Sequence, residues 1–202
     1  MEKYIVIDLE TTGNSPATND KIIDVGIVII EDHHITEEYS TLLNPNKPIP
    51  PFISNLTGIL DKDVKDAPTF SEKAEHIAGM FEDGYLIAHN VPFDLGFLNG
   101  ELSNHGKEKL TNPVIDTVEL SRILYPQAPG FQLGQLAEYF NIGHEDPHRA
   151  LSDALVTAKL FLILKKKIDT LPYETVTQLL RLQRALHSDL YQLLYKRQQK
   201  MK

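Results

Sequence analysis

Two acidic side chains at the end of a short apolar segment are the first candidates for chemistry. Asp8 and Glu10 follow the apolar residues 4–7 and precede a turn of sequence Thr11-Thr12-Gly13. Because successive side chains of a β-strand alternate between its two faces, residues two apart leave the same face and can share a ligand. Carboxylate oxygens suit Mg²⁺ or Mn²⁺ better than a soft metal. Without further context, the pair also fits a solvated strand end.

Two further acidic residues stand near the starts of expected helices. Asp94 closes the segment 89–94, in which a strand is expected to give way to a helix. An aspartate at such a position is usually a cap for free backbone N–H groups. Asp153 falls among the apolar residues of an amphipathic segment, where a carboxylate is costly without a partner. A metal ion is one such partner.

The spacing of His148 and Asp153 bears on the role that a histidine would play. Five residues of a regular α-helix turn through about 500°, so the two side chains would lie well apart around the axis. They need not hold the same ion. The spacing suits a histidine in the loop or first turn ahead of the helix, from which it reaches over a substrate. The alternative is a surface histidine without a chemical role.

The order of the expected elements indicates an α/β fold. Apolar runs predict five strands, at residues 4–8, 21–30, 35–43, 85–88 and 114–116. Short connections between the first three favour antiparallel pairing. After residues 44–51 the pattern changes to helices separated by single strands, which is typical of a sheet with helices packed on it.

The spacing of apolar residues predicts helices at 93–105, 132–140 and 150–167, the last of which ends in three lysines that suit the helix dipole. Leu171-Pro172 then breaks the chain, and residues 173–197 form a further helical region. We place a boundary near residue 169. It separates a domain of residues 1–168 from a helical extension, or linker to another domain or partner, of residues 169–202.

Three other polar groups have simpler structural explanations. Asp116 and Glu119 fit a helix-capping box. Asp24 interrupts an apolar strand, and we expect it to face a polar neighbour or solvent rather than a metal. His144 stands four residues before the loop histidine, but Pro147 between them argues against one helix presenting both to zinc.

Charge and cysteine content limit the classes of protein. The formal net charge of −8 argues against tight binding of a polyanion, unless bound divalent cations supply the positive charge. The chain has no cysteine, so disulfides and thiolate zinc sites are excluded. The N-terminal sequence does not resemble a signal peptide, and no apolar run approaches the roughly 18 residues of a membrane span. A cytoplasmic protein is expected.

Three segments, taken together, resemble the motifs of the DEDDh exonucleases. They are IVIDLETTG at 5–13, AHNVPFD at 88–94 and HRALSD at 148–153. The resemblance covers about residues 4–165, and the combination at these separations is specific. It implies a ribonuclease-H-like fold, in which helices flank a mixed five-stranded sheet whose first three strands are antiparallel.

The resemblance also implies a role for each candidate residue. Asp8, Glu10 and Asp153 become direct ligands of two divalent cations, Mg²⁺ or Mn²⁺. Asp94 supports the second cation, partly through water, and His148 becomes the general base. Residues that would line the sugar and base of the terminal nucleotide, or match the aromatic of the second motif, are Thr11, Thr12, Leu56, Thr57 and Phe93.

The chemistry that these roles imply is hydrolysis of a phosphodiester. Two metal ions can activate water on one side of the phosphorus and stabilise the departing oxygen on the other. An imidazole with a pKa near neutrality suits removal of the water's proton. The family implies release of nucleoside 5′-monophosphates from the 3′ ends of single-stranded DNA.

Several settings for this activity stay open. Segments 116–126, 146–154 and 171–182 are similar to the N-terminal exonuclease domain of bacterial DinG-like helicase-related proteins, where the C-terminal helices would lead to a larger helicase-like portion. A proofreading subunit that docks a DNA polymerase through residues 169–202 is an alternative. So is a ribonuclease that trims RNA ends. A non-catalytic nucleic-acid-binding module would lack a carboxylate or the histidine, and none is missing.

Overall fold

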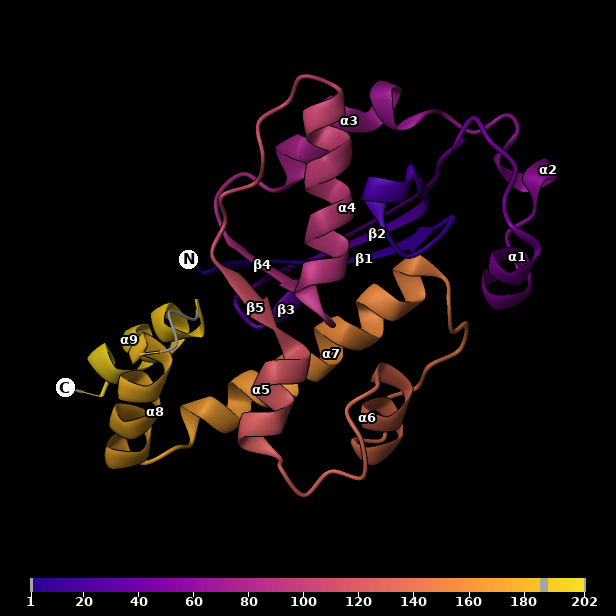
Figure 1. Ribbon diagram of the computed structural model, residues 1–202. Helices are drawn as coiled ribbons and strands as arrows, with labels where there is room; N and C mark the ends of the chain where they lie inside the picture. Colours follow the sequence, from indigo (N-terminus) through magenta and orange to yellow (C-terminus); the bar gives the residue numbers. More distant parts are fainter. Residues whose placement is uncertain (1, 186–188, 202) are drawn as a thin grey trace.

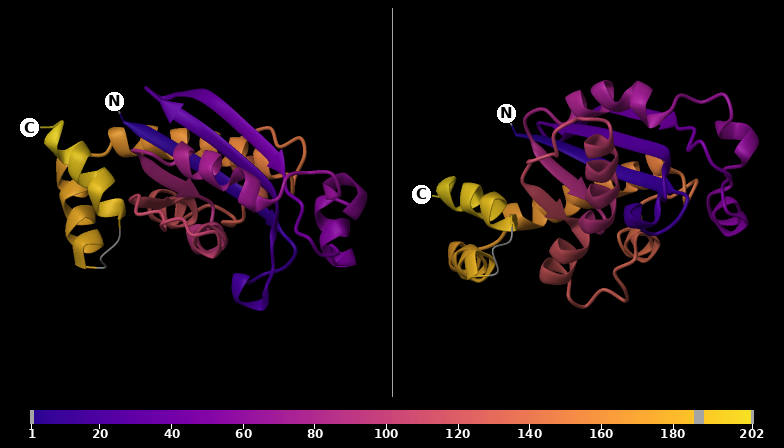
Figure 2. Two further views of the ribbon diagram at one scale, coloured as in Figure 1. Left: turned by 90° about the horizontal axis from the view of Figure 1, so that it is seen from above. Right: turned by 45° about the horizontal axis from the view of Figure 1, so that its top comes forward.

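A mixed five-stranded sheet lies between two layers of helices in the computed structural model, which describes residues 2–185 and 189–201 (Figures 1 and 2). Its strands are β1 (Lys3–Thr11), β2 (Ile22–Glu31), β3 (His34–Leu42), β4 (Tyr85–Ala88) and β5 (Val114–Asp116). They lie in the order β3-β2-β1-β4-β5. β2 pairs antiparallel with β1 and β3, whereas β4 pairs parallel with β1 and β5. The predicted strands and fold class are confirmed.

The predicted helices 93–105, 132–140 and 150–167 correspond to α4 (Val91–Asn104), α6 (Leu133–Tyr139) and α7 (Ala150–Asp169). Five other helical segments precede α7: η1 (Pro16–Thr18), α1 (Pro51–Thr57), α2 (Asp61–Val64), α3 (Phe70–Met80) and α5 (Thr117–Leu124). Of these, only α5 was indicated, by the cap at Asp116. In the described part of the chain, no helix has both the length and the apolar content needed to span a membrane.

The central strand β1 is buried on both faces, and this determines where its acidic residues point. Tyr4 and Val6 belong to the core cluster that contains the apolar residues of α7, whereas Ile5 and Ile7 pack with those of α3 and α4. Because side chains alternate along a strand, the even-numbered acidic residues that follow Val6 leave the face covered by α7. The acidic residues of β1 and the predicted residues of α7 are thereby brought to the same face of the sheet.

The C-terminal helices pack on the same core. α8 (Tyr173–Ala185) and α9 (Leu190–Gln199) replace the single predicted region 173–197, of which residues 186–188 lie outside the described residues. Their buried apolar side chains join the cluster of Tyr4 and α7 and are Val176, Leu180, Leu190, Leu193 and Leu194. The apolar stripe of this region therefore covers the chain's own core, and a boundary near residue 169 stays a prediction.

A glycine allows α7 to cross β2 at close range. A Cβ atom added to Gly26 would lie 2.2 Å from the carbonyl carbon of Ala150, the first residue of α7. That separation is far below van der Waals contact, so any side chain at position 26 forces the backbone of the helix away from the strand. The first turn of α7 therefore depends on this glycine.

We expect Gly26→Ala to destabilise the protein by about 1–3 kcal/mol, the usual cost of overpacking, because the obstacle is backbone rather than a flexible side chain. Denaturant unfolding measures this change. Gly96→Ala in α4 is the matched control, since a Cβ atom there meets nothing within 4 Å. It should raise stability by roughly 0.5–1 kcal/mol through helix propensity. Equal effects of the two substitutions would contradict the close approach.

Candidate active site

Asp8 and Glu10 lie where β1 extends beyond its parallel neighbour. β4 pairs with Tyr4–Val6, and among the described residues no strand pairs with the later part of β1 on that side. The register with β2 shifts between Glu10 and Thr11, which marks a β-bulge or irregularity at the end of the strand. Both carboxylates are partly buried. The strand thus presents them near its carboxyl end, beside the first turn of α7.

Asp153 lies in the first turn of α7 and is largely buried. One of its carboxylate oxygens, Oδ1, lies 2.5 Å from Nε2 of His144, and the other, Oδ2, accepts a hydrogen bond from the backbone N–H of His148 at 3.3 Å. The loop before α7 therefore folds back over the carboxylate. His144 was expected to be a structural residue, and its contact with Asp153 had no signal in the sequence.

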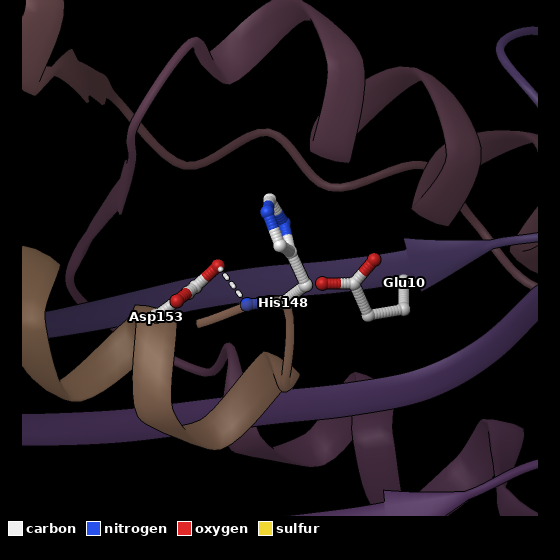
Figure 3. Close-up of side chains that lie close together, drawn as sticks. All are labelled: Glu10, His148 and Asp153. Carbon is white, nitrogen blue, oxygen red and sulfur yellow. Dashed lines mark hydrogen bonds between the residues drawn. The ribbon is translucent and has the colours of Figure 1, made fainter. Parts of the chain in front are cut away.

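His148 stands two residues ahead of α7, in the loop position that the spacing predicted. Its side chain is exposed and, in Figure 3, lies between the carboxyl groups of Glu10 and Asp153. One potential ligand atom from each of these three residues lies within 4.8 Å of the others. Residues 10 and 153, which are far apart in the sequence, thus converge at one place.

Asp94 approaches from the opposite face of the sheet. It is buried in the first turn of α4, and its Oδ1 accepts a hydrogen bond from the backbone N–H of Leu9 at 3.0 Å. The start of α4 is held instead by Asp116, whose carboxylate accepts from the backbone N–H groups of Asn90 and Val91. Asp94 is therefore bound to β1 between the two predicted ligands of that strand.

Asp116 and Asp24 have the structural roles that were expected of them. Asp116 accepts a hydrogen bond from the backbone N–H of Val118 at 2.8 Å and caps α5. Asp24 is buried on β2 and forms an ion pair with Arg149, with 3.1 Å between Nε and Oδ2. The polar neighbour predicted for Asp24 is thus the residue directly after His148.

Burial and mutual repulsion raise the pKa values of the acidic cluster. Burial raises the pKa of Asp8 well above its ordinary value, and the carboxylates of Asp94, Asp153 and Glu10 raise it further. Burial is also the main cause for Glu10, whose pKa rises to about 8 with added repulsion from Asp153 and Asp24. The pKa of Asp94 is raised by burial although the Leu9 N–H opposes the shift. Such groups favour a proton or a cation.

The donor set fits a hard divalent cation. The carboxylate oxygens of Glu10 and Asp153 are close enough to share an ion, with the His148 imidazole beside them, and Asp8 and Asp94 add electrostatic pull. Oxygen-rich sites of this kind suit Mg²⁺ or Mn²⁺. A bound cation would remove the repulsion that now raises these pKa values.

The residues expected to line the substrate lie in different surroundings. Thr11 and Thr12 are buried. The Thr11 hydroxyl donates to the Gly13 carbonyl within the turn, and the Thr12 hydroxyl accepts from the Lys21 N–H just before β2. Thr57 is buried, and its hydroxyl donates to the Ile53 carbonyl. The other two are available to a ligand to different degrees: Leu56 is 52% exposed, and Phe93 is half-buried against Phe97. Their contacts with substrate stay predictions.

The mixed sheet and its cluster of acidic residues are typical of metal-dependent nucleases, and comparison with known proteins identifies the family. The exonuclease family known as RNase T matches residues 5–161. The chain belongs to this family of exonucleases.

Two curated relatives show which members are similar over nearly the whole chain. The chain is 46% identical over 193 residues to the 3′-5′ exonuclease DinG of Bacillus subtilis (strain 168), covering 96% of this chain and 21% of the relative. It is 38% identical over 195 residues to the 3′-5′ exonuclease DinG of Staphylococcus aureus (strain MRSA252), covering 96% and 22%. The chain thus spans about a fifth of the length of these relatives.

Solved structures share the fold at low sequence identity. Exonuclease X in complex with 5′ overhanging duplex DNA has a TM-score of 0.64 at 24% identity, covering 81% of this chain and 91% of that one. Escherichia coli exonuclease I in complex with a dT13 oligonucleotide has a TM-score of 0.77 at 18% identity, covering 91% and 44%. The nuclease domain of 3′hExo, a DEDDh family member bound to rAMP, has a TM-score of 0.71 at 19% identity, covering 82% of this chain and 92% of that one.

The raised pKa values predict how stability depends on pH when no metal is present. Between about 4.5 and 8, the ordinary and raised values for Glu10, the folded chain holds protons that the unfolded chain has released. The free energy of unfolding should therefore fall as pH rises through this range, and Mg²⁺ should restore it most strongly above pH 8.

Asp8→Asn removes one of the repelling charges while keeping the shape of the side chain. It should make the metal-free protein more stable above pH 8 by about 1 kcal/mol or more, the equivalent of roughly one pKa unit. Thermal unfolding in chelator across pH measures both effects. Unchanged stability of Asp8→Asn at high pH would show that the carboxylates do not repel one another.

Proposed function

We propose that this chain is a metal-dependent 3′–5′ exonuclease domain. It hydrolyses the terminal phosphodiester bond of single-stranded DNA and releases nucleoside 5′-monophosphates by a two-metal mechanism. The observation that carries this proposal is the convergence of Glu10, His148 and Asp153, with a ligand atom of each within 4.8 Å of the others. Membership of the exonuclease family and the names of the DinG relatives support the same reaction and polarity.

The acidic residues hold the cations in this proposal. Asp8, Glu10 and Asp153 are direct ligands, and Asp94, held against β1 by the Leu9 N–H, supports the second ion. Bound Mg²⁺ or Mn²⁺ supplies positive charge that neutralises the phosphate and stabilises the charge that develops as the bond breaks. This accounts for a nuclease with a net charge of −8, because the protein's own lysines and arginines need not neutralise the scissile phosphate.

His148 is the general base. Its imidazole is exposed, adjacent to Glu10 and Asp153, and free of the core, so it can reach a water molecule that attacks the terminal phosphate. An imidazole accepts a proton near neutral pH, which suits this task. The exposed position also lets the imidazole contact the 3′ end of a nucleic-acid strand without movement of the β-sheet.

Single-stranded DNA is the substrate that we propose, with support from the dT13 oligonucleotide bound in the exonuclease I structure that shares this fold. No described residue of the site tests for a 2′-hydroxyl group. We further propose that the domain acts beside a helicase-like portion, as the DinG resemblance implies. Burial of the apolar faces of α8 and α9 supports this setting over a polymerase-proofreading subunit, because those faces pack on the chain's own core.

A nuclease assay with 5′-labelled and 3′-labelled single strands tests the reaction, its polarity and its cofactor together. We expect a ladder of shortened 5′-labelled products, early release of the 3′ label as a mononucleotide, and dependence on Mg²⁺ or Mn²⁺. Matched RNA strands run in parallel should be cut more slowly. Undiminished cleavage in excess chelator would refute metal dependence, and faster loss of RNA would assign the domain to RNA ends.

Substitutions separate the metal ligands from the base. Asp153→Ala should abolish both turnover and Mn²⁺ binding, whereas His148→Ala should lower kcat by about 10²–10⁴-fold, the usual contribution of a general base, with Mn²⁺ affinity largely kept. Calorimetric titration with Mn²⁺ and steady-state kinetics measure the two properties. His33→Asn, in the turn between β2 and β3, is the control and should change neither. Full turnover by His148→Ala at neutral pH would remove its assigned role.

A further inference from the structure

A buried aspartate on β2 binds the two residues that follow the proposed base. Asp24 is only 1% exposed, and its Oδ2 accepts hydrogen bonds from the Arg149 Nε at 3.1 Å and from the backbone N–H of Ala150 at 3.3 Å. The Ala150 N–H belongs to the first turn of α7, where backbone donors have no partner within the helix. Asp24 therefore fixes both a side chain and the backbone at this point.

The backbone of His148 is in a conformation that needs such support. Its φ is +64°, in the left-handed region that L-residues other than glycine seldom adopt. Conformations of this kind persist where surrounding contacts impose them. On one side the backbone N–H of His148 donates to Asp153, and on the other the next two residues are bound to Asp24. The proposed base is thus held from both sides.

The position of Asp24 connects this support to the metal-binding strand. Asp24 is the register partner of Glu10 across β1 and β2. Two residues further along β2, Gly26 lets the first turn of α7 lie directly against the strand. One short stretch of β2 therefore sets the distance between the carboxylates of β1 and the loop that carries His148.

We propose that Asp24, acting through Arg149 and the Ala150 N–H, is a positioning residue that holds His148 in place for hydrolysis. This inference rests on the proposed function and deepens it. Arg149 is 45% exposed at its side chain and could instead contact a substrate phosphate directly. The test must therefore distinguish an effect through His148 from an effect on substrate binding and from an effect on folding.

A double-mutant cycle makes this distinction. Asp24→Asn, which keeps the shape and removes the charge, should lower kcat by about 10- to 100-fold, the scale on which small misplacements of catalytic groups act. KM and Mn²⁺ affinity should stay within about threefold of the parent values. In a His148→Ala background, Asp24→Asn should lower kcat by less than about twofold, because the group it positions is already gone.

Two further variants protect the test. Arg149→Gln alters the half-exposed ion-pair partner of Asp24. It replaces Asp24→Asn in the double-mutant cycle if that variant folds poorly, and its effect on kcat should likewise be lost in the His148→Ala background. Glu101→Gln is the control for loss of a buried ion pair, since Glu101 is 4% exposed and lies 2.8 Å from the Lys21 ammonium, outside the site. It should lower the melting temperature, and any effect on kcat should be equal with and without His148.

The possible outcomes are distinct. An equal fractional loss of kcat from Asp24→Asn in both backgrounds would overturn the positioning role and leave the general base intact. A raised KM with unchanged kcat in Arg149→Gln would do the same and assign that side chain to the substrate. Full turnover by His148→Ala alone would instead remove the general base itself, and the positioning role with it.

Discussion

Repulsion among carboxylates at the end of β1 is the unfavourable interaction that the packing of the rest of the molecule must offset. Asp8, Glu10, Asp94 and Asp153 are gathered where burial and their own charges raise the pKa values of three of them. Such a cluster destabilises the fold unless protons or cations neutralise it. The packing of the sheet and helices must therefore outweigh this cost, and the proposed divalent cations would neutralise the same charge density.

Two helices reduce the cost of this repulsion because their N-terminal ends point at β1. Asp94 and Asp153 both lie in the first turn of their helices, α4 and α7, where the helix dipole favours negative charge. The two helices pack on opposite faces of the sheet. Their first turns reach the same end of β1, because Asp94 accepts from the Leu9 N–H and Asp153 lies beside Glu10. The favourable ends of two helix dipoles are thus brought to the place where negative charge accumulates.

Much of this arrangement could be predicted from sequence, because strong periodic burial leaves a strong pattern. All five strands and the three helices predicted before residue 169 appear, and the predicted ligand Glu10 lies beside His148 and Asp153. The short helices α1 and α2 were missed because each buries only one or two side chains. Contacts such as those of His144 with Asp153 and of Asp24 with Arg149 were not predictable, because they depend on how loops and strands meet in space rather than on local spacing.

The separation in sequence between the parts of the site has a consequence for synthesis of the chain. Asp24 and Arg149 are 125 positions apart in the sequence. Glu10, near the start of the chain, lies beside Asp153, which belongs to the much later helix α7. Contacts of such long range cannot form before both segments have been synthesised, and bringing the segments together costs loop-closure entropy. A nascent chain that has left the ribosome only as far as β5 therefore carries Asp8, Glu10 and Asp94 but neither His148 nor Asp153, so the proposed site is incomplete until α7 emerges.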